Sequence, residues 1–292
     1  MKKIQQQIKK IILFGLLMLG ISIIYSSPAY AEDRFKCFTQ SGNESCTKAL
    51  NTSTECRLQY DYTINVDDVG GDGVVLSIHG GSIEPYTSEL AQQVADKLTW
   101  KRYDFFGHAT PLCSDECSND ASKNRIINFR NLHITSTEFN DERALTLVKN
   151  NSRTVSVHGY SPRRTDDRKQ ICVGGRNTDT NAENRPNRQA ARFIEYINNQ
   201  SGLDLKAINA RKKNIGLPCG EAIVGTTEFK ALRGSAKKNI VNQNPSHEGL
   251  QLEFHLDLLE GLATDLEDPQ YQTYLEAILN AVDYAVAEEN AN

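Results

Sequence analysis

Hydrophobic positions follow two different periods along the chain. Short apolar runs at residues 74–78 and 154–157 suit β-strands, and each is followed by a segment with helical spacing, 90–98 and 190–197 respectively. A last apolar stripe with helical spacing runs from 271 to 286, the pattern of a helix packed on a core. This alternation of strand and helix patterns predicts βα units, and therefore an α/β fold with a mostly parallel sheet.

Residues 159–189 break this pattern. The segment is rich in polar residues and carries a turn signal at Val173-Gly174-Gly175. A connection of this length in a compact domain is usually disordered or functional. We therefore expect an irregular segment here.

The N-terminus has the pattern of a targeting segment. Lysines at positions 2, 3, 9 and 10 precede the uncharged run Ile11–Tyr25, and Ala29-Tyr30-Ala31 is a small-x-small cleavage site. This predicts a signal peptide over residues 1–31 and a secreted protein, extracellular or periplasmic. Because the apolar run is short for a membrane span, we expect no stable membrane association after cleavage.

The cysteines fit an exported protein. All seven, at 37, 46, 56, 113, 117, 172 and 219, follow the predicted signal peptide, as expected where disulfides persist. Three of them crowd into a polar stretch, so we expect a cysteine-rich extension over 32–68 and one α/β domain over 69–292. Their pairing cannot be deduced, and an odd count leaves one over. Cys113 and Cys117 could be half of a zinc site, but without a second close pair a structural disulfide is favoured.

The formal net charge of −4 argues against a nucleic-acid partner. Basic residues nevertheless concentrate between Arg153 and Arg192, where nine Lys or Arg face four acids. Two interpretations remain open for this segment. It is either a solvated loop face or a patch that attracts an anionic ligand.

Two histidines follow strand-like runs at equivalent points. His79 comes directly after the run 74–78, with two glycines that permit a sharp turn and with Glu84 five residues later. His158 ends the second run and is also followed by glycine. Ligands of open α/β sheets bind beyond the carboxyl ends of the strands, so both histidines would converge if their strands share one edge. Two histidines and a carboxylate are a ligand set for zinc, although each histidine taken alone is better explained as a structural or surface group.

Four segments also resemble a known family. His79–Glu84, Leu132–Thr137, Ser156–Tyr160 and Val173–Gly175 are similar, in this order, to segments of the poly-gamma-glutamate hydrolases, zinc amidohydrolases related to the M14 carboxypeptidases. The resemblance covers roughly residues 70–262. Ser82 departs from the family pattern, because it is placed differently among the glycines.

The resemblance implies a fold and a metal site. The expected fold is a carboxypeptidase-like (phosphorylase/hydrolase-like) three-layer α/β/α sandwich with a mixed, mostly parallel sheet. The expected cofactor is one Zn²⁺ per chain, bound by His79, Glu84 and His158, with a water completing the site. In the related carboxypeptidases a glutamate near the end of a late strand takes the proton of the water. The resemblance therefore implies Glu253 as the general base, because apolar and polar residues alternate over 250–254 as on a strand; Glu248 is its nearest competitor.

Substrate contacts are expected on two further segments. The family match makes His133, Ser136 and Thr137 candidates, because hydroxyls and an imidazole can hold a carboxylate or an amide oxygen. Alternatively, these three residues form a polar cap where a strand leads into a helix, and do not contact substrate. Arg130 and Arg176 are candidates for a bidentate grip on a carboxylate, and Arg176 has the better position.

The sequence thus predicts a secreted zinc-dependent hydrolase that cleaves γ-glutamyl amide bonds of poly-gamma-glutamate, with this anionic polymer or a related peptide as its partner. Two alternatives stay open. One is a zinc carboxypeptidase or cell-wall amidase that acts on another bond, and the other is a non-catalytic secreted binding module. Internal or terminal cleavage, D or L preference and oligomeric state are not encoded in any pattern that we can interpret.

Overall fold

The computed structural model of the chain describes residues 44–49, 57–111, 132–160, 169–179, 185–210, 219 and 232–287. For residues 44–49, 57–61 and 108–111 it describes the backbone alone. All of these residues belong to one compact unit that spans 41–292. The predicted signal peptide, Cys113, Cys117 and Arg130 lie outside the described residues.

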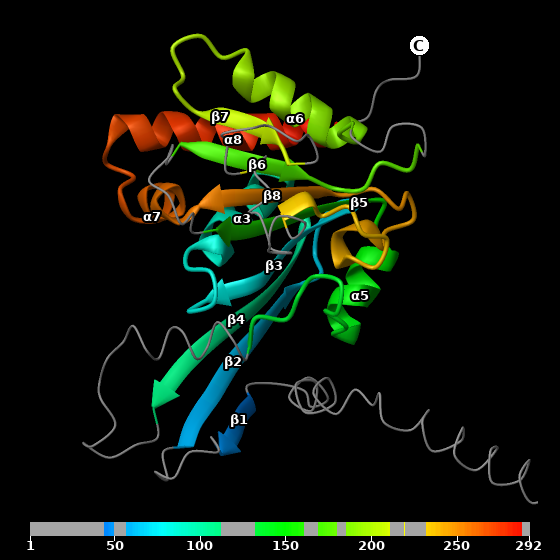
Figure 1. Cartoon of the computed structure of the whole chain (residues 1–292), viewed down its shortest axis with the longest axis vertical. Coiled ribbons are helices and arrows are strands. Elements are labelled where there is room, and N and C mark those ends of the chain that lie inside the picture. The colour runs from blue at the N-terminus through cyan, green and yellow to red at the C-terminus, as the bar shows by residue number, and fades with distance from the viewer. Residues whose placement is uncertain are drawn as a thin grey trace, which may run out of the picture. The chain divides into compact units, whose positions relative to one another are not determined.

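The fold is built on one eight-stranded sheet with the order β1-β2-β4-β3-β5-β8-β6-β7. Figure 1 shows the strands in this order, from β1 at the bottom to β7 at the top. The strands are β1 Glu44–Ala49, β2 Arg57–Asp67, β3 Gly73–Gly81, β4 Lys101–Pro111, β5 Arg153–Tyr160, β6 Gln170–Gly174, β7 Lys206–Asn209 and β8 Leu250–His255.

The sheet is mixed and mostly parallel. Strands β4, β3, β5 and β8 form its parallel centre. Antiparallel pairs join β1 to β2, β2 to β4 and β8 to β6, and β7 runs parallel to β6. The prediction of a mixed, mostly parallel sheet is therefore confirmed.

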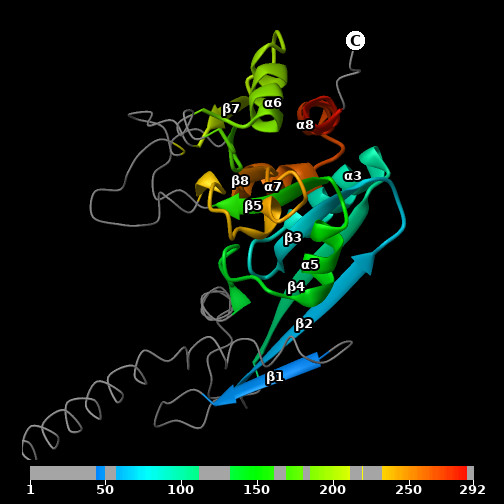
Figure 2. The ribbon, with the colours of Figure 1, turned by 90° about the vertical axis from the view of Figure 1, so that its right-hand side faces the viewer.

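Helices lie on both faces of the sheet. They are α3 Thr87–Leu98, α5 Glu142–Lys149, α6 Arg188–Asn198, α7 Leu256–Thr264, α8 Pro269–Val286 and the 3-10 helix η4 Ile240–Asn242. In Figures 1 and 2, α6 and α8 lie side by side at the β7 end of the sheet, and α3 lies beside β3. Helices α3, α6, α7 and α8 share one apolar core with the strands, so they form one layer.

The strand pattern explains this core. Val155 and Val157 of β5 are fully buried in it, as are Leu250 and Leu252 of β8. Side chains alternate between the two faces of a strand, so the residues between these point away from the α3, α6, α7 and α8 layer. The face opposite to these helices therefore carries the even-numbered residues of β5, and Ser156 is one of them.

Helix α5 and η4 lie on this second face. Phe139, just before α5, makes edge contacts with the rings of Tyr103 and Phe105 on β4. Asp104 lies between these two aromatic residues on β4, so its side chain points to the opposite face. There the negative charge of Glu89 on α3 contributes to raising the pKa of its carboxyl group. The order helix, sheet, helix confirms the expected three-layer α/β/α class.

Two segments differ from the expectations. The irregular segment predicted over 159–189 contains strand β6, since Gln170–Gly174 pairs with β8 and is entirely buried. Residues 57–67, which we assigned to the extension, form β2 and pair with β4 over ten positions. In both cases the neighbouring strand supplies the hydrogen bonds that the local pattern does not predict.

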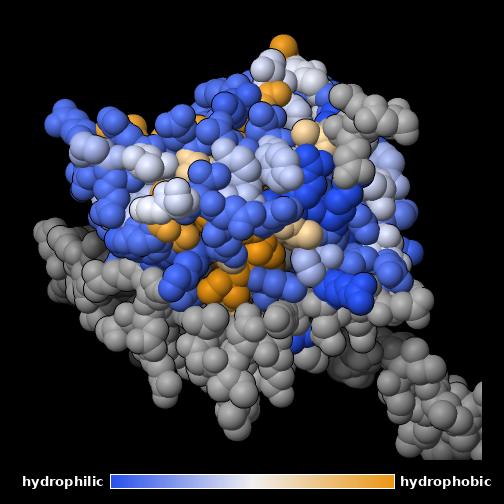
Figure 3. All heavy atoms as spheres, turned by 90° about the horizontal axis from the view of Figure 1, so that it is seen from above, coloured by the Kyte–Doolittle hydropathy of each residue, from blue (hydrophilic) through white to orange (hydrophobic). Residues whose placement is uncertain are grey.

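One face of the described part is mostly polar. Figure 3 shows the face above α6 as largely hydrophilic, with apolar side chains gathered in a small area near its middle. No helix among the described residues is long and apolar enough to span a membrane.

Candidate metal centre

The His79–Glu84 segment leaves β3 through a tight turn. The N–H of Glu84 donates to the carbonyl of His79 at 2.7 Å and closes this turn. Gly81 has a φ of +68°, and a Cβ there would lie 2.5 Å from the carbonyl oxygen of Gly107. The turn thus needs glycine at this position, as its sequence suggested.

The start of α3 fixes the other end of the same turn. The hydroxyl of Thr87 donates to the carbonyl of Glu84 at 2.8 Å. It also accepts a hydrogen bond from the hydroxyl of Ser77 at 3.1 Å, so the turn is tied back to β3. These buried hydroxyls hold Glu84 in a defined position before the first turn of the helix.

His158 approaches the same point from the neighbouring strand. Strands β3 and β5 are parallel, so their carboxyl ends share one edge of the sheet. The Nδ1 atoms of His79 and His158 lie 3.1 Å apart. The two strand-terminal histidines therefore converge as predicted.

His79, Glu84 and His158 form a buried cluster. Their nitrogen and carboxylate ligand atoms all lie within 4.8 Å of one another. Oε1 of Glu84 is 2.8 Å from Nδ1 of His79, and Oε2 is 3.3 Å from Nδ1 of His158. The exposed fractions of the three residues are 3%, 5% and 2%, so water does not screen the cluster.

The hydrogen bond on the outer side of the His79 ring shows which ring nitrogen carries the proton. The other nitrogen then has a lone pair that faces the cluster. Its Nε2 lies 2.8 Å from the carbonyl oxygen of Ile134, and a carbonyl can only accept a hydrogen bond. The proton of the neutral ring is therefore on Nε2, which leaves a lone pair on Nδ1. This lone pair faces the acceptor oxygen of Glu84, so the contact needs a cation or a further proton between them.

His158 has a similar outer partner. Its Nε2 lies 3.0 Å from the hydroxyl oxygen of Ser156, which can accept a hydrogen bond from the ring N–H. Such a contact leaves Nδ1 free to act as a ligand. Metal-bound histidines characteristically use their second nitrogen in this way.

The electrostatics also favour a positive charge in the cluster. Burial lowers the pKa of His79 to about 4, so its ring is neutral. Burial alone would raise the pKa of Glu84, but the two histidines outweigh it and hold this pKa well below the usual range. Burial also opposes protonation of His158, yet Glu253 and Glu84 together raise its pKa. The two imidazoles and the carboxylate together are a donor set that fits Zn²⁺.

Glu253 lies beside this cluster on β8. The register of β5 and β8 places it directly opposite His158. The side chain is buried, and its Oε1 accepts a hydrogen bond from Nε2 of Gln251 at 2.6 Å. Burial raises the pKa of Glu253 to about 8, although His158 opposes the rise. The carboxyl group can thus exchange a proton near neutral pH, as a general base must.

The competitor Glu248 occupies a different place. Its Oε1 accepts hydrogen bonds from the backbone N–H and the hydroxyl of Thr178, at 2.9 and 2.7 Å. The residue precedes β8, whereas His158 pairs near the end of this strand. Its position gives no support to Glu248 as the base.

His133 contacts the cluster, whereas the contacts of Ser136 and Thr137 are with other parts of the chain. The His133 ring stacks on His79 with 4.1 Å between centroids, and its Nε2 lies 3.3 Å from Oε1 of Glu84. The carbonyl of Ser136 accepts a hydrogen bond from Ile240 of η4. Thr137 is exposed, with its hydroxyl 3.4 Å from that of Thr135. Roles for Ser136 and Thr137 in substrate binding stay predictions.

Arg176 lies toward the opposite end of β8. Because β6 is antiparallel to β8, the residues after β6 come to lie beside the start of β8. The N–H of Arg176 donates to Asn242, and its carbonyl accepts from Asn187. Arg176 as a whole residue is half-buried, and its guanidinium has no hydrogen-bond or ion-pair partner among the described residues. Its role, like that of Arg130, stays a prediction.

The described part of the basic segment 153–192 mostly serves the fold. Arg153 donates to the carbonyl of Val286, and Arg188 and Arg192 donate to that of Ala287. Cationic side chains at this position stabilise the end of α8. Lys169 forms an ion pair with Asp204. These described cations thus contact groups of the fold, a role that neither the solvated loop face nor the anion patch had predicted.

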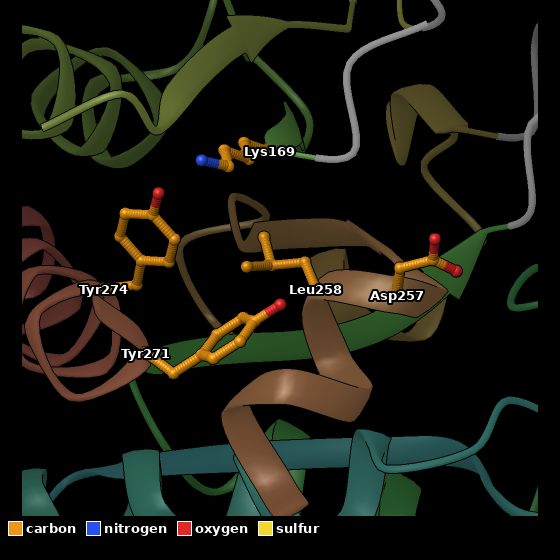
Figure 4. Close-up of a pocket in the computed structure, with 5 residues that line it drawn as sticks. All are labelled: Lys169, Asp257, Leu258, Tyr271 and Tyr274. Carbon is orange, nitrogen blue, oxygen red and sulfur yellow. The ribbon is translucent and has the colours of Figure 1, made fainter. Parts of the chain in front are cut away.

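A small pocket of about 130 Å³ lies apart from the cluster. It is lined by Lys169, Asp257, Leu258, Tyr271 and Tyr274. Figure 4 shows Lys169 directed toward Tyr274, whose ring centroid is 5.6 Å from the ammonium group. Leu258 and Tyr274 belong to the core under α7 and α8. This pocket therefore lies on the face of the sheet that α3, α6, α7 and α8 cover, and Ser156 lies on the opposite face.

Sequence analysis missed several groups that support the centre. The hydroxyl of Ser156 and the carbonyl of Ile134 hold the outer nitrogens of the two histidines. The N–H of Gly159 donates to Oε2 of Glu84 at 2.8 Å. A disulfide joins Cys172, which pairs with Glu253 in the sheet, to Cys219. Backbone groups have no sequence signature, and only the alternation on β5 could have indicated Ser156.

Comparisons with solved structures support the fold. The chain is similar to a bacteriophage poly-gamma-glutamate hydrolase, with 24% identity and a TM-score of 0.51 over 75% of this chain and 87% of that chain. It is equally similar to the structure described as "YNDL-apo (Zinc-free)", with 24% identity and a TM-score of 0.51 over 77% and 91% of the two chains.

Sequence comparisons identify the family. The SPbeta prophage-derived UPF0714 protein YoqZ of Bacillus subtilis (strain 168) is 29% identical over 192 residues, which are 66% of this chain and 52% of that protein. UPF0714 protein YndL of the same organism is 31% identical over 160 residues, 55% and 50% of the two chains. The matches thus cover about half the length of these relatives. The poly-gamma-glutamate hydrolase family model matches residues 48–204, more than half of the 292 residues, and the chain therefore belongs to this family.

Proposed function

We propose that this protein is a zinc-dependent hydrolase that cleaves γ-glutamyl amide bonds of poly-gamma-glutamate. The observation that carries the proposal is the convergence of three buried ligand atoms on one point, beside the carboxyl group of Glu253. Family membership supplies the reaction class. The name "YNDL-apo (Zinc-free)" implies a zinc-bound form of that relative, which supports zinc as the metal.

His79, Glu84 and His158 would hold the ion through two Nδ1 atoms and a carboxylate. When bound, zinc polarises a scissile carbonyl and lowers the pKa of water. Its positive charge would also lower the pKa of Glu253, because a nearby cation favours a carboxylate. Glu253 would then be ionised at neutral pH and able to accept a proton.

Glu253 would transfer the proton during hydrolysis. Since Gln251 occupies Oε1, the other oxygen, Oε2, is the one that takes a proton from the attacking water. The same group then gives this proton to the nitrogen of the departing amine, which completes cleavage of the amide. His133 would donate a hydrogen bond to the substrate, and its stacking on His79 at the edge of the cluster supports this role.

The substrate is a polymer with a free carboxylate on every residue. Such a polyanion would be attracted by cationic groups, and the binding would weaken with salt. Arg176 remains a candidate contact for one of these carboxylates, since this residue is partly exposed. Action outside the cytoplasm is part of the proposal, and it is supported by the signal-peptide pattern and by the Cys172–Cys219 disulfide.

One experiment tests the function against its alternatives. The purified protein, with zinc added, is incubated with poly-gamma-glutamate and, separately, with peptides. Loss of polymer length without release of terminal amino acids from peptides supports the proposal. Release from peptides alone would indicate a carboxypeptidase. No hydrolysis of either, in protein that binds no zinc, would indicate a binding module.

A further inference from the structure

A chain of buried amide side chains leads from η4 to Glu253. Nδ2 of Asn239 donates to Oε1 of Gln251 at 2.9 Å, and Nε2 of Gln251 donates to Oε1 of Glu253 at 2.6 Å. The exposed fractions of Asn239, Gln251 and Glu253 are 4%, 1% and 5%. Water therefore does not compete for these hydrogen bonds, and each side chain depends on the next for its partner.

The direction of this chain is fixed at its outer end. Oδ1 of Asn239 accepts the N–H of Val241 at 3.1 Å, and so caps η4. A backbone N–H can only donate, so the Asn239 oxygen must face it and Nδ2 must face Gln251. Gln251 must in turn present its oxygen to Asn239 and its NH₂ group to Glu253. The orientation of both amides thus follows from one backbone group.

Packing also restricts Gln251. Gly234 has a φ of +57°, and a Cβ at this position would lie 2.5 Å from Oε1 of Gln251. The carbonyl of Gly234 is held by Nδ2 of Asn242 at 2.6 Å. The segment before η4 therefore packs directly against the Gln251 amide and leaves it little room to rotate.

We propose that Gln251 is a positioning residue for the general base, and that Asn239 sets its orientation. Gln251 holds Oε1 of Glu253 so that Oε2 stays free for proton transfer, and it supports the ionised form of this carboxylate with a hydrogen bond. The inference rests on the proposed function, because it assigns Gln251 a task in the same hydrolysis. It concerns only side chains that the structure places in contact.

The variant Asn239→Asp tests the orientation with almost no change in shape. The aspartate retains an oxygen for the N–H of Val241, but its second oxygen replaces the Nδ2 donor. Gln251 must then turn its NH₂ group toward position 239, which directs its own oxygen at Glu253. We expect kcat to fall by about tenfold or more, since a positioned base contributes about 10²–10⁴-fold, while KM and zinc content stay unchanged.

Gln243→Glu is the matched control. It adds the same charge in the same segment and removes the hydrogen bond from Gln243 to the carbonyl of Lys238, which does not lead to Glu253. Gln251→Met is a second test that removes both amide hydrogen bonds, and its zinc content reports whether the site has folded. A kcat for Asn239→Asp and Gln251→Met equal to that of the control would overturn the inference.

A stability measurement tests the chain independently of activity. In Glu253→Gln, the new amide can rotate to donate to a reversed Gln251, so the effect of Asn239→Asp should shrink. We expect Asn239→Asp to lower Tm by about 2–4 °C more in the wild-type background than in Glu253→Gln. Equal decreases in both backgrounds would overturn the inference. If the wild type hydrolyses no substrate, the proposed function fails, and this cycle still decides whether the amide chain is coupled to Glu253.

Discussion

The Nδ1 atoms of His79 and His158 lie 3.1 Å apart, although 79 positions separate the two residues in the sequence. The ring of His79 carries its proton on the opposite nitrogen, toward the carbonyl of Ile134. Its lone pair therefore faces a carboxylate oxygen of Glu84. A cation bound between these two acceptor atoms would satisfy both of them.

Replacement of Glu253 by glutamine should abolish proton transfer without loss of the metal. We expect hydrolysis to fall by about 10²–10⁴-fold, the usual contribution of a general base. Zinc content should stay at the wild-type level, because Glu253 is not one of the three ligands. Glu248→Gln is the control, since Glu248 contacts the Thr178 segment instead, and it should retain activity. Equal activity in the two variants would remove Glu253 from its role.

Ser156→Ala should weaken metal binding. The hydroxyl of Ser156 orients His158 through its Nε2 atom, and loss of such a partner typically weakens metal affinity by about 10–100-fold. Competition with a chelator measures this change. Ser152→Ala provides the comparison, because Ser152 lies just before the other end of β5 and contacts Asp72. An unchanged zinc affinity in Ser156→Ala would show that the hydroxyl does not orient the ring.

The disulfide between Cys172 and Cys219 should stabilise the fold. It joins two residues that are 47 positions apart, and such a constraint contributes about 2–4 kcal/mol by limiting the unfolded chain. We expect the double variant Cys172→Ala/Cys219→Ala to lose about this much free energy of unfolding in urea. Peptide mapping without reductant should find the two cysteines in one linked pair. Linkage of either one to another cysteine would contradict the structure.

Asp104 should make stability depend on pH. Burial raises the pKa of its carboxyl group to about 7 from 3.8, and the Arg102 guanidinium 2.6 Å away only partly opposes this. Between these values the folded protein keeps a proton that the unfolded chain has lost, so stability falls as the pH rises toward 7.

Asp104→Asn removes this effect, because asparagine stays neutral. We expect the Tm of the variant to exceed that of the wild type at pH 8, and the difference to shrink at pH 4, where the wild-type carboxyl is protonated as well. Thermal unfolding of both proteins across this range measures the difference. A difference that does not change with pH would mean that Asp104 is charged throughout.

The patterns that predicted the convergence of His79 and His158 are short-range. His79 and His158 each lie near the carboxyl end of a buried strand and precede glycine, and two adjacent parallel strands bring such ends together. Helix α8 followed from its apolar stripe and β8 from its alternation. In these segments the local pattern and the tertiary environment favour the same structure.

Other features depend on distant partners and have no local pattern. Strand β6 is five residues long and lies between polar segments, so only its pairing with β8 shows that it is a strand. The arginines at 153, 188 and 192 resembled an anion patch, but they reach the end of α8, about a hundred residues further along the chain. The contact from the carbonyl of Ile134 to His79 is a backbone interaction, which side-chain identity does not predict.

Zinc content is the most direct measure of the central claim. The buried His79, Glu84 and His158 cluster should bind one Zn²⁺ per chain, as determined by elemental analysis of the purified protein. His79→Ala and His158→Ala should each lose the metal, while His247→Ala, outside the cluster, should keep it. Wild-type protein that contains no zinc after incubation with the metal, or histidine variants that bind as much as the wild type, would contradict the account.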